Sequence, residues 1–274
     1  MPKLIVSLTT IPTRVQYLTP LLSYLKRQTL KPDAVELNVP HAYKHRAFSK
    51  ADLALIPSDF TVHMCDDVGP ATKVVPTLQR YNGSDTTIVY CDDDRIYSNN
   101  WLERYVARAA LHPETAITDE CAPVRLIVKA YQGINKDPAY RLKRAASFGF
   151  YRPYHFDRAA EPDIVEGYGG VLVKPQFFAE TVHEVPQSCW AVDDIWLSAN
   201  LRSAGTKVQF YGRKASEVSK PLRIDGQDIG GTNESLTLTT VGGRDRHQLN
   251  YDAVKYCIEN LNVWTEHKAA FDLA

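Results

Sequence analysis

The chain has 274 residues, of which 44% are hydrophobic and 23% charged, and its 32 basic and 32 acidic side chains cancel. This is the composition of an ordinary folded protein, and a net charge of zero argues against a nucleic-acid partner. No apolar run is long enough to cross a bilayer, so no transmembrane segment is expected, although peripheral association with a membrane stays open. The start of the sequence lacks a signal-peptide pattern, and five scattered cysteines without a CxxC pair favour reduced thiols in a cytoplasmic protein.

The first third of the chain alternates between strand and helix patterns. An apolar strand at 3–8 is followed by helical spacing from Tyr17 to Leu25 and by a second strand at 34–39. A third strand at 61–64 and a helix at 71–80 follow. This β-loop-α-β order predicts an α/β fold of the Rossmann-like type, with a mixed, mostly parallel sheet and helices on both faces.

Three consecutive carboxylates close the fourth predicted strand. The apolar residues Ile88, Val89 and Tyr90 lead into Asp92, Asp93 and Asp94. Ligands of open α/β sheets bind at the carboxyl ends of strands, and hard oxygen donors suit Mg²⁺ or Mn²⁺. Asp92 and Asp94 would point the same way on an extended backbone. The competing interpretation is a solvated acidic turn in which an Asp caps the next helix.

Two other loops at strand ends carry groups that suit a nucleotide. Thr9, Thr10 and Arg14 follow the first strand, at a position where such folds bind ligands. Lys73 lies one turn inside the helix that begins after Gly69-Pro70, where its charge would add to the helix dipole and favour a phosphate. Asp66 or Asp67 could accept hydrogen bonds from a ribose or a base, or simply cap the helix. A surface arginine and a solvated lysine are the plain alternatives.

The middle of the chain is less regular. A helix is expected at 101–111, and the apolar residues of 119–131 predict another strand. The segment 132–163 is rich in arginines and aromatic residues and has no apolar periodicity, which is typical either of a functional loop that stacks on sugars or of a surface insertion. A short strand is predicted at 171–173, and a helix is expected from Pro175 to about Thr181.

Acidic and glycine-rich motifs mark the rest of the chain. Glycines in the segment 166–170 would let the backbone approach a ligand closely. Asp193 and Asp194 open a helix that we expect to be amphipathic, and two acids are more than an N-cap needs. A strand at 207–211 precedes the polar segment 213–248, which we expect to be a mobile loop, and a last helix at 251–261. His247, at the end of that loop, is either a surface histidine or a residue that completes a metal site.

Together these motifs resemble the family 2 glycosyltransferases of the GT-A fold. The resemblance covers roughly residues 3–211. It rests on the segments 7–14 and 69–73, on the DxD pattern of 92–94, on the glycine segment 166–170 and on the acid pair 193–194. The second acid motif of the family is usually Glu-Asp, so the Asp-Asp of this chain leaves open which acid acts as the base. The Gln-x-x-Arg-Trp motif of processive synthases is absent.

The resemblance implies a single GT-A domain over 1–274, with a nucleotide-sugar half at 1–115, an acceptor half at 116–212, and a mobile loop and C-terminal helix at 213–274. It implies inverting transfer of a sugar from a nucleoside-diphosphate sugar to a glycan or lipid-linked glycan, with Mn²⁺ or Mg²⁺. The implied roles are a base at Asp194 or Asp193; donor binding by Thr9, Thr10, Arg14, Asp67, Lys73, Asp92 and Asp93; metal binding by Asp92, Asp94 and His247; and acceptor binding by Glu166, Gly167, Tyr168 and Gly169.

Two other classes of function use the same residues. A metal-dependent nucleotidyltransferase or phosphohydrolase would also gather acids at a strand end, although it would normally bring more acid and His ligands. A non-catalytic module that binds nucleotide sugars would keep the binding residues and need no base.

Overall fold

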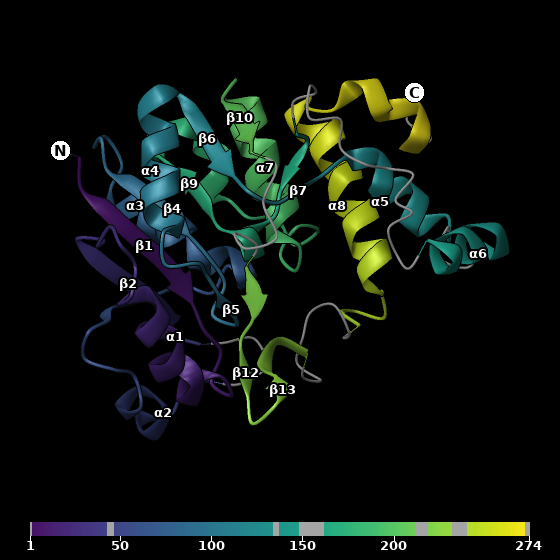
Figure 1. Ribbon diagram of the computed structural model, residues 1–274. Helices are drawn as coiled ribbons and strands as arrows, with labels where there is room; N and C mark the ends of the chain where they lie inside the picture. Colours follow the sequence, from purple (N-terminus) through teal and green to yellow (C-terminus); the bar gives the residue numbers. More distant parts are fainter. Residues whose placement is uncertain are drawn as a thin grey trace.

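The structure is a computed structural model, and it describes residues 2–42, 47–133, 137–147, 162–211, 219–231 and 240–271. Within these ranges, seven strands form one central sheet in the order β10-β6-β9-β4-β1-β2-β3 (Figure 1). The strands are β1 (Leu4–Thr9), β2 (Ala34–Pro40), β3 (Thr61–Cys65), β4 (Thr87–Tyr90), β6 (Thr115–Thr118), β9 (Val171–Val173) and β10 (Lys207–Phe210).

The sheet is mixed and mostly parallel, as the sequence predicts. β1 lies parallel to both β2 and β4, β2 is parallel to β3, and β10 is parallel to β6. β9 runs antiparallel between β4 and β6. The carboxyl ends of β1 and β4 therefore meet at one edge of the sheet, which brings the loops that follow them together.

Helices cover both faces of the sheet. Successive side chains of β1 point to opposite faces, and both sets are buried against helices. Leu4, Val6 and Leu8 join one buried cluster with α1 (Leu18–Leu25) and α4 (Trp101–Leu111). Ile5 belongs to the opposite cluster, with α3 (Val75–Arg80) and α7 (Asp193–Ser203). A strand buried on both faces must be apolar at every position that lacks a polar partner. In β1 the buried polar residue is Ser7, whose hydroxyl donates to the carbonyl of Lys73 at 2.6 Å.

A third cluster lies beside the sheet. α5 (Val124–Tyr131) packs against α8 (Arg246–Leu261), and α8 also contacts α7. Figure 1 shows α5 in teal next to α8 in yellow. α8 begins at Arg246 because the carboxylate of Asp245 accepts the N–H of Gln248 at 2.9 Å, which is an N-cap bond. This cap places the helix start earlier than the apolar pattern predicts.

The remaining described elements are short. They are α2 (Lys50–Ala54), α6 (Pro138–Ala146), β5 (Arg95–Ile96), β7 (Cys121–Ala122), β8 (Ile164–Val165), β11 (Lys220–Pro221), β12 (Arg223–Ile224), β13 (Gln227–Asp228), and the 3₁₀ turns η1 (Val15–Tyr17), η2 (Gly69–Lys73), η4 (Gly167–Gly169), η5 (Pro175–Phe177), η6 (Glu180–His183), η7 (Ile229–Gly231) and η8 (Thr265–Phe271).

The structure corrects several predicted elements. The expected strand within 119–131 is the helix α5, because Val124, Ile127 and Val128 share one buried helical face, a pattern that a short apolar run does not separate from a strand. The predicted helix at 71–80 is a 3₁₀ turn followed by α3, and the one after Pro175 is two 3₁₀ turns. β6 was not predicted.

Three further expectations also change. α7 is buried on nearly all sides rather than amphipathic, since Trp196, Ser198 and Asn200 are buried together with its aliphatic residues. α6 occupies part of the segment that we expected to be irregular, and residues 134–136 and 148–161 of that segment lie outside the described residues. Within 213–248, residues 219–231 form short strands and a turn, while 213–218 and 232–239 lie outside the described residues.

The five cysteines are all free thiols. Among the described residues, no helix is long and apolar enough to cross a membrane.

Candidate active site

A cavity of about 440 Å³ lies where β1 and β4 end. The register places Ser7 beside Tyr90, so the loops after the two strands face each other. The predicted residues that line this cavity are Thr9, Thr10, Arg14, Asp67, Lys73, Asp92, Asp93, Asp94, Tyr168, Asp193 and Asp194. Residues from five separate motifs of the sequence thus meet in one place.

Arg14 and Thr10 hold the last two acids of the 92–94 motif. The guanidinium of Arg14 lies 2.9 Å from Asp93 Oδ1 and 3.0 Å from Asp94 Oδ2. The hydroxyl of Thr10 donates to Asp93 Oδ2 at 2.6 Å. Asp93 is thereby buried with both oxygens bonded, which suits a structural anchor more than a ligand contact.

Asp94 is the least compensated acid of this motif. Burial, together with the neighbouring charges of Asp93 and Asp92, raises its pKa to about 7, although Arg14 and Arg95 act in the opposite direction. A carboxylate that is crowded by like charges binds an added cation favourably. Burial and like charges therefore disfavour the ionised form of Asp94.

Lys73 joins the two acid motifs. Its ammonium lies 2.6 Å from Asp92 Oδ1, 2.9 Å from Asp193 Oδ2 and 3.9 Å from Asp194 Oδ1. Burial acts against the charge of Lys73, but Asp193, Asp92 and Asp194 outweigh it and raise its pKa well above the usual value. The lysine that we expect to reach a phosphate thus lies among three carboxylates at the cavity.

Asp194 lies at the first turn of α7, against the glycine segment. Its Oδ1 accepts the N–H of Gly167 at 3.0 Å, and a Cβ on Gly167 would collide with Lys73 Nζ and lie 3.2 Å from Asp194 Oδ1. A side chain at this position would therefore push the end of Lys73 out of its place. Burial and the neighbouring Asp193 raise the pKa of Asp194 to about 8, against the effect of Lys73. A carboxylate with a raised pKa is a stronger base than an ordinary one.

The segment 219–231 closes one side of the cavity, which sequence patterns hardly indicate. β11 pairs with β5, directly after the acid motif, and Leu222 donates its N–H to the carbonyl of Asp94 at 2.8 Å. A Cβ on Gly230 would lie 2.5 Å from Asp94 Oδ2. Arg95, Asp228 and Arg246 also line the cavity without having been predicted. The one available signal was the pair Gly230-Gly231.

The other predicted residues occupy less central positions. Asp67 accepts the N–H of Gly69 at 2.9 Å, a turn bond that agrees with the capping alternative. The hydroxyl of Thr9 donates to the carbonyl of Asn38 at 2.8 Å. A Cβ on Gly169 would collide with the side chain of Glu120. Glu166 and His247 line a second cavity, of about 190 Å³, which Asp194 and Arg246 also line.

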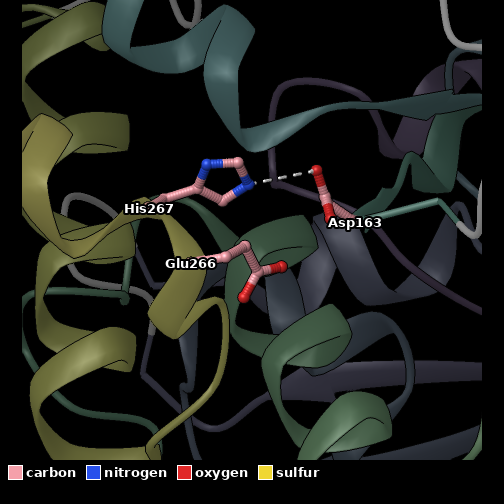
Figure 2. Close-up of side chains that lie close together, drawn as sticks. All are labelled: Asp163, Glu266 and His267. Atoms are coloured by element: carbon pink, nitrogen blue, oxygen red, sulfur yellow. Dashed lines mark ion pairs between the residues drawn. The ribbon is translucent and has the colours of Figure 1, made fainter.

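The predicted metal ligands divide between the two cavities, since Asp92 and Asp94 line the first and His247 lines the second. Among the described residues, the group with ligand atoms at metal-binding spacing is Asp163, Glu266 and His267 (Figure 2). Arg202 already pairs with Glu266 at 2.8 Å and with Asp163 at 3.5 Å, so one cationic side chain contacts both carboxylates of that group. Asp92 and Asp94 are paired with Lys73 and Arg14, and His247 lies at the second cavity rather than beside them.

Comparison with known proteins gives structural likenesses only. No protein-family model matches the chain, and no curated protein matches it. Among solved structures, it is similar to a mannosyltransferase from Pyrobaculum calidifontis in complex with GDP-mannose and Mn²⁺, with 16% identity and a TM-score of 0.47, over 77% of this chain and 55% of the other.

Two more solved structures are similar. One is TarS from S. aureus in complex with UDP, with 10% identity and a TM-score of 0.45, over 97% of this chain and 74% of the other. The other is the galactosyltransferase LgtC in complex with donor and acceptor sugar analogues, with 9% identity and a TM-score of 0.41, over 76% and 72%. Two of the three are sugar transferases by name, but TM-scores below 0.5 do not establish a shared fold.

Proposed function

We propose that the protein is a metal-dependent inverting glycosyltransferase of the GT-A type, which transfers a sugar from a nucleoside-diphosphate sugar to a hydroxyl of a glycan or lipid-linked glycan. The observation that carries this proposal is the meeting of two acid motifs across Lys73, with Asp92 on one side and Asp194 on the other. Metal-assisted glycosyl transfer needs one acidic centre for the diphosphate and a separate base for the acceptor.

The charges of the cavity fit a divalent cation. Seven Asp residues and four cationic side chains line it, which is a formal excess of three negative charges when every acid is ionised. Carboxylate oxygens are the ligands that Mg²⁺ and Mn²⁺ prefer. When the diphosphate binds, Lys73 would pair with a phosphate instead of Asp92, and Arg14 with a phosphate instead of Asp94. Asp94 and Asp92 would then hold the ion together. The bound ion would supply Lewis-acid stabilisation of charge on the leaving diphosphate.

The side chains divide the remaining work. Arg14 and Lys73 place positive charge where the diphosphate would bind, and Thr10 fixes Asp93 and so the acid motif. Asp194 would take the proton of the acceptor hydroxyl as the hydroxyl oxygen forms a bond to the anomeric carbon of the donor. The bond from that carbon to the diphosphate oxygen would break at the same time. We favour Asp194 over Asp193 because Asp194 lines both cavities, whereas Asp193 lines only the first and lies 2.9 Å from Lys73.

A nucleotidyltransferase or phosphohydrolase is the second candidate. It would use the same acids to activate an attack on phosphorus. It is less well supported because Asp194 also lines a second cavity with mostly apolar walls, which an attacking water does not require. The product that leaves would distinguish the two chemistries.

Metal-dependent donor binding tests the proposal directly. We expect one nucleoside-diphosphate sugar in a panel of UDP-, GDP- and dTDP-sugars to raise the melting temperature in the presence of Mn²⁺. At about 100 times Kd, ligand binding stabilises a protein by about 2.7 kcal/mol, and at about 2–4 °C per kcal/mol this raises the melting temperature by about 5–10 °C.

The controls are Mn²⁺ alone, each nucleotide sugar with EDTA, and each sugar 1-phosphate. A shift that appears equally with EDTA would contradict the metal dependence. The absence of a shift with every donor at millimolar concentration would contradict the proposal as a whole.

A further inference from the structure

The second cavity borders the same acid as the first but has different walls. It lies between α5, α8 and the start of α7, and it shares Asp194 and Arg246 with the main cavity. A hydroxyl bound in it can therefore reach the proposed base, while the first cavity holds the donor. Its volume of about 190 Å³ is below the roughly 300–1,000 Å³ of sites for drug-sized ligands. It has room for one sugar ring rather than a chain.

The walls of this cavity are mostly apolar. Seven of its twelve lining residues are Ala, Val, Leu or Ile, and among them Ile127, Ile164 and Ile195 are buried. A ring that carries a hydroxyl on every carbon would leave some of these hydroxyls without partners against the aliphatic wall, which is costly. The wall instead favours a sugar that presents a methyl group.

The polar groups come from Glu166 and α8. Asn250 Oδ1 is buried and, among the residues that the structure describes, has no hydrogen-bond partner. Burial raises the pKa of Glu166, whose Oε2 accepts the hydroxyl of Tyr168 at 3.3 Å. A buried amide oxygen without a partner calls for an N–H or O–H donor from a ligand. An amide on the sugar would satisfy Asn250 and place its methyl group against the aliphatic wall.

We propose that this cavity is the acceptor subsite and that it binds a sugar with an acylamino group, such as an N-acetylhexosamine. The acylamino N–H pairs with Asn250, its methyl group contacts the residues of α5 and α7, and a ring hydroxyl reaches Asp194. The role as an acceptor subsite rests on the proposed function, whereas the selectivity for an acylamino sugar follows from the walls of the cavity alone.

The test measures binding of simple glycosides by NMR titration of the full chain. The probes are the methyl glycosides of N-acetylglucosamine and N-acetylgalactosamine, each matched with the methyl glycoside of glucose or galactose. One added hydrogen bond and one buried methyl group predict about tenfold tighter binding of an acylamino glycoside than of its unsubstituted partner.

Three variants assign that selectivity to the cavity. Ala130→Trp fills the cavity and is expected to weaken acylamino binding at least about tenfold, whereas Lys129→Trp, at an exposed neighbouring position on the same helix, is expected to have no effect. Asn250→Leu keeps the side-chain volume and is expected to remove most of the preference. Circular dichroism checks that each variant is folded.

Donor binding in the same samples separates the two proposals. Donor shifts with Mn²⁺ but no preference for the acylamino glycosides, or a preference that survives both Ala130→Trp and Asn250→Leu, overturn the subsite and leave the proposed function intact. A preference that both variants remove, in a protein that binds no donor, supports the sugar site and overturns its role as an acceptor subsite.

Discussion

Replacing Asp194 with Asn is expected to lower the rate of transfer about 100- to 10,000-fold while leaving donor binding intact, since general-base catalysis contributes about that factor. The substitution keeps the shape of the side chain and an oxygen for the N–H of Gly167, so the fold and the glycine segment should survive. Lys73 keeps Asp92 and Asp193 as partners. Only the ability to take a proton at that position is lost.

Steady-state kinetics and the Mn²⁺-dependent thermal shift together measure this effect. Asp85→Asn is a matched control, because Asp85 is largely exposed and pairs with Lys174 outside the cavity. If Asp193→Asn abolishes transfer and Asp194→Asn does not, the base is Asp193. Full activity in both variants would rule out an aspartate base in this motif.

The pH profile gives a second readout of the same residue. Burial and Asp193 raise the pKa of Asp194 to about 8, and a base must be deprotonated to act. The wild-type rate should therefore rise with pH through a value well above the range of an ordinary carboxyl group. A rate that is constant from pH 5 to 9 would argue against Asp194 as the base.

Replacing Asp94 with Ala is expected to remove the Mn²⁺-dependent part of donor binding. The expected thermal shift of about 5–10 °C in the wild type should then fall close to the shift seen with EDTA. Asp94 is the acid whose pKa is raised to about 7 by burial and by Asp93 and Asp92, so its charge opposes folding near neutral pH unless a cation is bound. The variant should therefore remain folded.

Asp59→Ala is the control for this experiment, because Asp59 is half exposed and pairs with Lys26 at the surface. Titration calorimetry with Mn²⁺ and the preferred donor would show the loss directly. Unchanged metal-dependent binding in the Asp94→Ala variant would place the metal elsewhere, and Asp92 and Asp228 would be the next acids of the cavity to replace.

Much of the scaffold could be predicted from local patterns. The apolar run that ends at Asp92 predicts the strand β4. The β-loop-α-β order at the start of the chain predicts β1 and β2 and indicates that they run parallel. Because parallel strands end at the same edge, the meeting of Arg14 with the 92–94 motif follows from these patterns. Short apolar runs failed where helix and strand patterns coincide, as at Val124 and Ile127.

The partners within the site could not be predicted in the same way. Lys73 pairs with acids that are 19 and 120 residues away in the chain, and no local pattern encodes such a contact. No local pattern predicts the close approach of Gly230 to the side chain of Asp94 either. The same is true of the hydrogen bond from the N–H of Leu222 to the carbonyl of Asp94. The sequence pointed to the chemical groups at the carboxyl edge of the sheet, and the tertiary structure decides which of them neutralise one another.

The bond that breaks in the donor tests the central claim most directly. In glycosyl transfer the anomeric carbon–oxygen bond breaks, so the nucleoside diphosphate leaves intact. In nucleotidyl transfer or phosphohydrolysis a phosphorus–oxygen bond breaks instead. We predict that ³¹P NMR of the protein with its preferred nucleotide sugar, Mn²⁺ and an acceptor glycoside will show only the nucleoside diphosphate as the phosphorus-containing product. Appearance of a sugar 1-phosphate or a nucleoside monophosphate would contradict a glycosyltransferase.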